Sequence, residues 1–227
     1  MKKVILFDLD STLTDRKLSI IKYAYSFYKQ FCDQLKKNDL NLVKKVLLKA
    51  DGDGHRNKSE VFSEIQKNLT WQIVPSLDEL TENWELHFPN ATIARKGVME
   101  TIKQFHVNEF KLGIITNGSS FGQRQKIKTL GLQKYFEYII ISEEVGYRKP
   151  QLEIFNIALK QAKAEANDVI YVGDHPVYDI DGSIQAGLKS IWLSIRKWPS
   201  YLPAPRYKFS EFKNLIDIVN SINISEE

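Results

Sequence analysis

The stretch Val4-Ile-Leu-Phe-Asp-Leu-Asp-Ser-Thr-Leu-Thr-Asp15 joins a short apolar run to two carboxylates that stand two positions apart. Short runs of β-branched, leucine and aromatic side chains are typical of strands that are buried on both faces of a sheet. Residues i and i+2 of an extended chain face the same side, so Asp8 and Asp10 can both address one bound group. The stretch predicts a buried parallel strand that ends in functional carboxylates.

Four further apolar runs follow the same pattern, at residues 112–115, 138–141, 169–172 and 190–193. Helical stretches are predicted between and after them, at residues 123–130, 152–164, 180–186 and 211–222. Alternating strands and helices favour an α/β fold, a doubly wound parallel sheet of the Rossmann-like kind with right-handed crossovers. A short run at residues 207–209 is expected to lie near the edge of that sheet.

About a hundred residues separate the first two strands, far more than a usual crossover, so we expect an inserted domain. Apolar residues recur there in steps of three and four, which predicts about four amphipathic helices and a small α-helical bundle. The aromatic side chains of these helices are interpreted as its core. The predicted boundaries are residues 1–14 and 94–227 for the α/β core and 15–93 for the helical insert.

The composition of the 227 residues, with 43% hydrophobic and 26% charged, excludes disordered, collagen-like and disulfide-scaffold proteins. A net charge of +4 is too small for a dedicated nucleic-acid binder but favours small anionic ligands. The single cysteine, Cys32, cannot form an internal disulfide, and the first apolar run is too short for a signal peptide or a membrane span. We therefore expect a cytoplasmic protein without a membrane or nucleic-acid partner; its oligomeric state stays open.

Ligands of open parallel sheets bind beyond the carboxyl ends of the strands, so the residues that follow each run are the candidate site. These residues are Asp8, Asp10, Thr116, Asn117, Lys149 and Asp174. Carboxylate oxygens suit Mg²⁺, and a lysine offsets the charge of a phosphate group, so the set points to phosphoryl chemistry. Asp8 could then attack phosphorus, while Asp10 would protonate the leaving oxygen and later deprotonate the hydrolytic water.

Four segments of the chain resemble, in order, the sequence motifs of the haloacid dehalogenase (HAD) superfamily of phosphatases. They are Asp8-Leu-Asp10-Ser-Thr-Leu13-Thr-Asp15, Ile114-Ile-Thr116-Asn117-Gly118, Gly146-Tyr-Arg-Lys149-Pro150 and Gly173-Asp174-His-Pro-Val-Tyr-Asp179. The insert between the first two motifs resembles the C1-capped branch (subfamily I), which includes phosphoglycolate phosphatase, β-phosphoglucomutase and several nucleotidases. One departure is Ser11, where many relatives carry glycine, and we expect it to leave the chemistry intact.

The resemblance implies a nucleophile, Asp8, that forms an aspartyl-phosphate, and an acid and base, Asp10. It implies that Thr116 and the backbone of Asn117 hold the phosphate and that Lys149 neutralises charge on both nucleophile and phosphate. Mg²⁺ would be held by the carboxylates of Asp8 and Asp174 and the backbone carbonyl of Asp10. Asp179 would position a metal-bound water or Lys149.

The leading interpretation is a Mg²⁺-dependent phosphomonoesterase for a small phosphorylated metabolite, with a cap domain that closes over the site. A nucleoside monophosphate, phosphoglycolate and a sugar phosphate all stay open as substrates. Dehalogenase activity is disfavoured by Asp10 and Asp174, because the dehalogenases of this superfamily need no metal and typically lack the second acid. A phosphomutase, which shares the motifs, and a non-catalytic protein that binds a phosphorylated metabolite are further alternatives.

The loop Asp51-Gly-Asp-Gly-His55-Arg56 of the insert resembles a calcium loop only in part. Arg56 stands where such a loop requires glycine, and Phe62 stands where it requires a carboxylate, which excludes a calcium site of that type. The loop either reaches the substrate, in which case His55 and Arg56 select it, or is an ordinary turn between helices.

Overall fold

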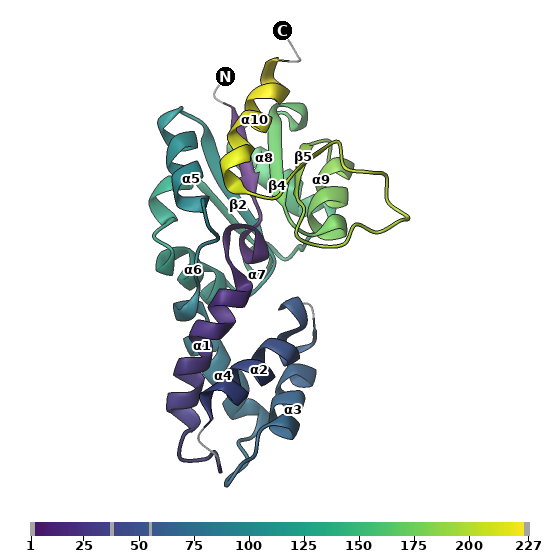
Figure 1. Cartoon of the computed structure of the whole chain (residues 1–227). Coiled ribbons are helices and arrows are strands. Elements are labelled where there is room, and N and C mark those ends of the chain that lie inside the picture. Colours follow the sequence, from purple (N-terminus) through teal and green to yellow (C-terminus); the bar gives the residue numbers. More distant parts are fainter. Residues whose placement is uncertain (1–2, 37–38, 55, 225–227) are drawn as a thin grey trace. The chain divides into compact units, whose positions relative to one another are not determined.

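A six-stranded parallel sheet with helices on both faces forms the centre of the chain's larger unit (Figure 1). In this computed structural model, residues 3–36, 39–54 and 56–224 are described. The strands are β1 (Val4–Phe7), β2 (Lys111–Thr116), β3 (Tyr138–Ile141), β4 (Val169–Gly173), β5 (Lys189–Leu193) and β6 (Tyr207–Phe209). Their order in the sheet is β3-β2-β1-β4-β5-β6, with every neighbouring pair parallel. The predicted α/β fold is confirmed, and β1 lies in the interior of the sheet.

The inner strands β1 and β4 are buried on both faces, and alternate residues of β1 serve two separate cores. Ile5 and Phe7 belong to the cluster on one face, and Val4 and Leu6 belong to the cluster on the other. Each strand that the apolar runs predicted begins or ends within one residue of its predicted position. A continuous apolar run is a strong signal here because both faces of an inner strand are covered.

Helices accompany the sheet in the described part of this unit, and their bounds differ from the predicted ones for local reasons. They are α5 (Val98–Val107), α6 (Ser120–Thr129), α7 (Ser142–Val145), α8 (Leu152–Ala162), α9 (Gly182–Gln185) and α10 (Leu215–Ile224). Helix α6 begins earlier than predicted because the hydroxyl of Ser119 accepts from the backbone of Gly122 and caps it. Helix α8 ends earlier because Lys163 adopts a left-handed conformation with φ 52°. Helix α5 was not predicted.

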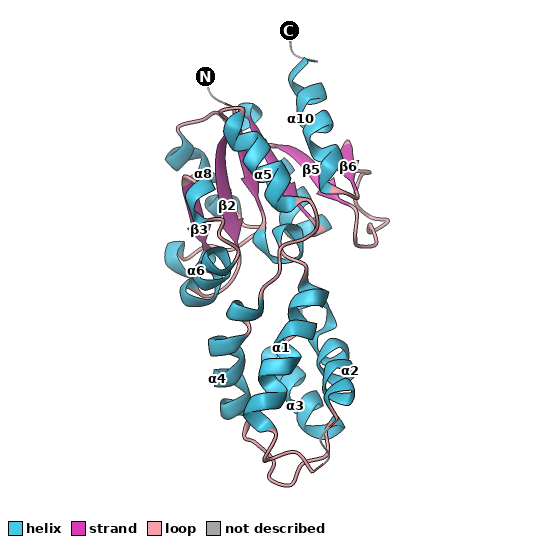
Figure 2. Ribbon diagram, turned by 60° about the vertical axis from the view of Figure 1, so that its left-hand side comes forward, coloured by secondary structure: helices cyan, strands magenta, loops and turns pink. Residues whose placement is uncertain are grey.

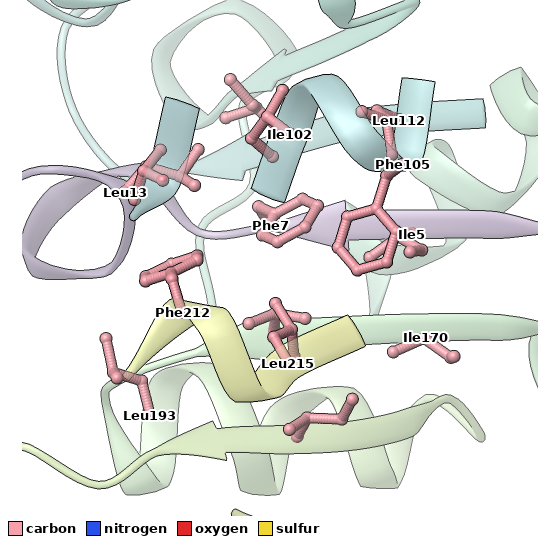
Figure 3. Packing of buried hydrophobic residues seen from close by; sticks show 14 of the residues in the cluster. Ile5, Phe7, Leu13, Ile102, Phe105, Leu112, Ile170, Leu193, Phe212 and Leu215 are labelled. Carbon is pink, nitrogen blue, oxygen red and sulfur yellow. The ribbon is translucent and has the colours of Figure 1, made fainter. Parts of the chain in front are cut away.

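Phe7 lies at the centre of the larger core cluster, on the sheet face covered by α5 and α10 (Figure 3). The centroids of its ring and that of Phe105 on α5 lie 6.4 Å apart. Phe212 and Leu215, from the C-terminal segment, belong to the same cluster. Helix α8 contributes Phe155 to the cluster on the opposite face. The two layers of helices hold β1, and with it the residue that follows β1, in a rigid frame.

The second unit, Asp15–Ile93, is built from helices and has its own core (Figure 2). Its main helices are α1 (Arg16–Phe31), α2 (Leu40–Asp51), α3 (Lys58–Asn68) and α4 (Leu77–His87). Tyr23, Phe27 and Trp84 are buried together in its core, which agrees with the interpretation of these aromatic residues as packing residues. About four amphipathic helices were predicted in this segment, and the described residues of the segment contain α1 to α4.

The chain leaves the α/β unit and returns to it at neighbouring points. Thr14 and Ala94 form an antiparallel bridge, and the backbone N–H of Asp15 donates to the carbonyl of Ile93 at 2.8 Å. The division of the chain into Met1–Thr14 with Ala94–Glu227 and Asp15–Ile93 falls at this bridge. Among the helices in the described ranges, none has both the length and the apolar character that crossing a membrane requires.

Candidate active site

Asp8 lies directly at the end of β1, where the ladder of the sheet continues for one more bond. Its backbone N–H donates to the carbonyl of Val172 at 2.9 Å, and its side chain is buried. The chain then makes a wide turn over Leu9–Leu13, in which Ser11 has a left-handed φ of 66°. This conformation costs an L-residue about 1–2 kcal/mol and costs glycine little. Ser11 therefore departs from the motif at a position with a backbone reason for glycine.

Arg95 braces the turn after Asp8 from the point where the chain returns from the insert. Its guanidinium donates to the carbonyl of Ser11 at 2.7 Å and to that of Thr12 at 3.3 Å. The backbone N–H of Ser11 is bonded in turn to the hydroxyl of Thr14 at 2.9 Å. The side chains of Arg95 and Thr14 thus hold the turn by bonds to its main chain, which leaves the side chains of Asp8 and Asp10 available for other partners.

Lys149 joins Asp8 to two other buried groups. Its ammonium donates to Asp8 Oδ1 at 2.7 Å, to Asp179 Oδ1 at 2.6 Å and to the hydroxyl of Tyr171 at 3.0 Å, which accounts for its three protons. Burial by itself would lower the pKa of Lys149, but the charges of Asp179 and Asp8 outweigh burial and raise it. Lys149 is therefore a fixed positive charge at the carboxyl end of the sheet.

Asp8, Asp174 and Asp179 form a buried acidic group in which one carboxylate oxygen from each lies within 4.8 Å of the others. Asp8 Oδ2 is buried and has no hydrogen-bond partner among the described residues. Burial raises the pKa of Asp8 well above its usual range, opposed by the charge of Lys149 and reinforced by Asp179 and Asp174. An unpartnered carboxylate oxygen beside two further carboxylates fits a hard divalent cation such as Mg²⁺, which would favour the ionised form.

Asp174, at the end of β4, is held by side chains from two other parts of the sheet. Its Oδ1 accepts from the hydroxyl of Thr12 at 3.3 Å, its Oδ2 accepts from Nε of Arg196, and its carbonyl accepts from the indole of Trp192 at 2.9 Å. Burial, together with the charge of Asp179, raises the pKa of Asp174 to about 6 against the opposing charge of Arg196. Arg196 is a contact that the sequence did not predict.

Asp179 is the third carboxylate of the buried acidic group. Its Oδ2 accepts from the backbone N–H of His175 at 2.9 Å, while its Oδ1 receives Lys149 and the hydroxyl of Tyr171. A Cβ added to Gly173 would lie only 2.4 Å from the Cβ of Asp179, so glycine is needed for this approach. The expectation that Asp179 positions Lys149 corresponds to a contact in the structure.

Asp10 is directed to a different set of partners from Asp8. Its carboxylate receives Nζ of Lys126 and Nε2 of Gln123, both from α6, and it does not belong to the buried acidic group. Its side chain is 28% exposed, against 8% for Asp8. The two carboxylates of the motif are therefore separated by environment, as two different chemical roles require.

Thr116 is the last residue of β2, the neighbour of β1, and Asn117 follows it. Thr116 is fully buried, and its hydroxyl accepts from Gln123. The side-chain amide of Asn117 accepts from the backbone N–H of Lys149 at 2.8 Å and donates to its carbonyl at 3.0 Å. Asn117 thus fixes the loop that carries Lys149, a contact that the sequence prediction for its backbone did not include.

The loop of the insert is held by internal contacts of the helical unit. Asp51 is buried and bonded to Arg16, and Arg56 is bonded to Glu64 and to the carbonyl of Ala50. A Cβ added to Gly54 would lie 2.5 Å from the guanidinium carbon of Arg16. His55, named above as a candidate for substrate selection, lies outside the described residues.

The sequence prediction missed four polar side chains of the site, namely Tyr171, Arg196, Gln123 and Lys126. Tyr171 stands inside an apolar run and reads as a core residue. Arg196 lies in the loop after β5, one strand beyond the motif residues, so the carboxyl-end rule could have included it. Gln123 and Lys126 lie on a polar helix, where a cation usually marks a solvated face.

A family model described as haloacid dehalogenase-like hydrolase matches residues 5–193. A curated relative from Pyrococcus furiosus, named glyceraldehyde 3-phosphate phosphatase, is 27% identical over 242 residues, covering 99% of this chain and 96% of the relative. A second relative, pyrimidine 5'-nucleotidase YjjG of Escherichia coli, is 43% identical over 108 residues, covering 46% of this chain and 48% of the relative.

A solved structure of the HAD-hydrolase YfnB from Bacillus subtilis, described as bound to magnesium, has the same fold. The TM-score is 0.76 at 22% sequence identity, and the match covers 96% of this chain and 99% of that chain. At this identity the likeness concerns the fold. The bound magnesium is described for that protein.

Proposed function

The chain belongs to the haloacid dehalogenase-like hydrolases, and from that membership we propose that it hydrolyses a phosphomonoester of a small metabolite. One observation carries the proposal. Asp8 is buried at the end of β1 with one carboxylate oxygen bonded to Lys149 and the other without a hydrogen-bond partner among the described residues. A purely structural carboxylate in such surroundings would be expected to bond both oxygens, because an unmade bond costs about 1–3 kcal/mol.

In the proposed reaction, Asp8 attacks the phosphorus atom and forms an acyl-phosphate bond as the ester P–O bond breaks. Asp10 gives its proton to the departing oxygen, which leaves as the free alcohol. In the second half, Asp10 removes a proton from a water molecule that attacks the phosphorus of the aspartyl-phosphate. The acyl-phosphate bond then breaks, which releases inorganic phosphate and regenerates the Asp8 carboxylate.

The remaining residues of the site would manage negative charge. Lys149 would neutralise the phosphate and Asp8 together, which lowers the repulsion between the anionic nucleophile and the anionic ester. The Thr116 hydroxyl and the backbone N–H of Asn117 would donate to the phosphate oxygens. Asp179, bonded to Lys149 at 2.6 Å, would keep the ammonium of Lys149 in place.

A divalent cation is part of the proposal. The carboxylates of Asp8 and Asp174 and the carbonyl of Asp10 would hold Mg²⁺, and the unpartnered Oδ2 of Asp8 supports this assignment. When bound, the ion would supply positive charge opposite the phosphate. The buried carboxylates of Asp174 and Asp179 add the negative charge that retains a divalent ion at such a place.

For the substrate we propose a small phosphorylated metabolite rather than a polymer. Relatives of this chain are named for glyceraldehyde 3-phosphate and for pyrimidine nucleotides, and the mildly basic chain suits anionic ligands. We propose the helical unit Asp15–Ile93 as the cap that selects among them. A single cysteine, which cannot form an internal disulfide, supports a cytoplasmic location.

The test is the release of inorganic phosphate from a panel of substrates, with Mg²⁺ and with a chelator. The panel holds glyceraldehyde 3-phosphate, pyrimidine and purine nucleoside monophosphates, phosphoglycolate and hexose phosphates. We expect chelator-sensitive release concentrated on one chemical class. Transfer of the phosphate to a second hydroxyl of the sugar, without release, would indicate a mutase, and binding without turnover of any ester would contradict the proposal.

A further inference from the structure

Helix α6 directs two buried polar side chains, Gln123 and Lys126, at the strand ends of the site. They stand three residues apart and so share one side of the helix. Lys126 is 8% exposed and Gln123 is 2% exposed, whereas Arg124 and Lys128 of the same helix are exposed. Lysine is rarely buried unless it is paired, and the reaction proposed above assigns no role to either residue.

Lys126 is bonded to Asp10 through both oxygens of the carboxylate. The distances from Nζ to Oδ1 and to Oδ2 are 2.8 Å each. Asp10 keeps partial access to solvent, with 28% of its side chain exposed. Bonds between an ammonium and a carboxylate are about twice as strong as bonds between neutral groups, so Lys126 restrains both the position and the rotation of the carboxylate.

Gln123 connects Asp10 to the hydroxyl of Thr116, the last residue of β2. Its Nε2 donates to Asp10 Oδ2 at 2.8 Å and also to the hydroxyl of Thr116. An amide nitrogen carries two protons, so one atom can serve both acceptors. A Cβ added to Gly118 would lie 3.0 Å from Cδ of Gln123, so glycine at this position leaves room for the amide.

We propose that Gln123 and Lys126 are positioning residues that hold the Asp10 carboxylate beside the Thr116 end of the phosphate site. The inference rests on the proposed function, in which Asp10 gives a proton to the departing oxygen as the P–O bond breaks. In this assignment both residues act through Asp10 and not on the ester. Proton transfer requires donor and acceptor to lie within hydrogen-bond reach, so a protonated Asp10 carboxyl group that can rotate away from the leaving oxygen delivers its proton less often.

The leaving group separates this role from a merely structural one. A 4-nitrophenolate ion departs without a proton, whereas an alkoxide from a sugar or a triose does not. The quotient kcat/KM covers the steps up to the first irreversible bond cleavage, which includes the departure of the leaving group. A misplaced Asp10 lowers kcat/KM for the alkyl ester and spares the aryl ester, while a damaged fold lowers both alike.

The experiment compares kcat/KM for 4-nitrophenyl phosphate with that for the alkyl phosphate that the wild type cleaves fastest. Lys126→Met should lower the alkyl value by about 10-fold or more and change the aryl value by less than about threefold. Asp10→Asn sets the full size of this difference, and Lys126→Arg should restore part of the alkyl value. Lys128→Met, an exposed lysine on the same helix, is the matched control and should change neither value.

An equal loss on both esters, or no loss on either, would overturn the inference while leaving phosphatase function standing. Where Lys126→Met does not fold, Gln123→Met provides the same comparison of esters. If neither variant folds, the pair is structural and the inference is wrong. A wild-type protein that cleaves no ester in the presence of Mg²⁺ would contradict the proposed function, and the inference with it.

Discussion

Each unit of the molecule buries an aspartate against a cation, and the two arrangements are built differently. In the helical unit, the guanidinium of Arg16 bonds both oxygens of Asp51, at 2.7 Å each. In the α/β unit, the ammonium of Lys149 bonds one oxygen of Asp8 at 2.7 Å, and the other oxygen is buried without a hydrogen-bond partner among the described residues. Both carboxylates are almost fully removed from solvent, at 4% and 8% exposure.

The two cations bond their carboxylates in different ways. A planar guanidinium matches both oxygens of a carboxylate and completes their bonding, which suits a purely structural pair. An ammonium bonds from a single nitrogen, so Lys149 can be shared with Asp179 and Tyr171 while one oxygen of Asp8 stays available. In the helical unit both oxygens of Asp51 are bonded, whereas Asp8 keeps one oxygen for a further group.

The largest expected effect concerns the incomplete pair. Asp8→Asn should lower phosphate release by about 10⁴-fold or more, because an amide cannot act as the nucleophile. The free energy of unfolding should change by less than about 2 kcal/mol, since the substitution also removes repulsion from Asp174 and Asp179. Phosphate release and urea unfolding of the same preparation measure both effects. A folded variant that keeps a tenth of the wild-type activity would show that Asp8 is not the nucleophile.

The complete pair should respond in the opposite way. Arg16→Met leaves Asp51 buried without its cation, which should lower the free energy of unfolding by about 3–5 kcal/mol. Urea unfolding followed by tryptophan fluorescence measures this, because Trp71 and Trp84 lie in the helical unit. The double variant Arg16→Met with Asp51→Leu should recover most of the loss. A single variant as stable as the wild type would show that the pair contributes little.

Activity of the folded Arg16→Met variant sharpens the comparison further. Arg16 packs against Gly54 and bonds Asp51, so it supports the loop whose role the sequence left open. A purely structural pair predicts a kcat within about threefold of wild type at temperatures where the variant is folded. A selective rise of KM would instead show that the loop contributes to substrate selection.

The next effect is the pH dependence of the free energy of unfolding, measured in the presence of a chelator. Burial raises the pKa of Asp174 in the folded protein to about 6, above its unfolded value near 4, so the folded protein binds this proton more tightly. Stability from this group is therefore fully present below about pH 4 and is lost as the pH rises through 6, by on the order of 2 kcal/mol. The wild type should lose stability relative to Asp174→Asn between pH 4.5 and 7. Parallel unfolding curves for the two proteins would contradict this, and added Mg²⁺ should reduce the wild-type loss.

The smallest effect separates backbone strain from the contribution of the Ser11 hydroxyl in the turn after Asp8. Ser11→Gly should raise the free energy of unfolding by up to about 1 kcal/mol, because glycine adopts a φ of 66° without strain. Ser11→Ala keeps the strain and should show no such gain. Thermal unfolding of the two variants gives the comparison, and phosphate release should stay within about twofold of wild type. A less stable Ser11→Gly variant would show that the hydroxyl makes a contact that matters.

The fold was predictable because its strands are buried on both faces and leave a continuous apolar signal. The residues at the carboxyl ends of those strands, Asp8, Thr116 and Asp174, could be proposed for the same reason, since parallel strands bring these ends to one edge. Lys149 follows no such rule and was identified through its motif. Helix α5 was not predicted, although Val98, Ile102 and Phe105 carry the spacing of an amphipathic helix.

The supporting contacts of the site were not predictable from one sequence. Arg196 and Lys126 are two of 32 basic residues, and nothing in their neighbours marks them as buried. Tyr171 continues an apolar strand, and its hydroxyl finds Lys149 only once β4 is placed beside β1. Such contacts depend on tertiary placement, whereas periodicity reports on local structure alone.

The bridge between Thr14 and Ala94 brings the two ends of the inserted segment next to each other in the α/β unit. A segment that begins and ends at bonded neighbours adds a closed loop, and the entropic cost of closing a loop grows only with the logarithm of its length. The two units also have separate apolar cores. Insertions, deletions or complete exchange of Asp15–Ile93 should therefore change the stability of the α/β unit little. The segment can then vary in sequence more freely than the strand ends on either side of it.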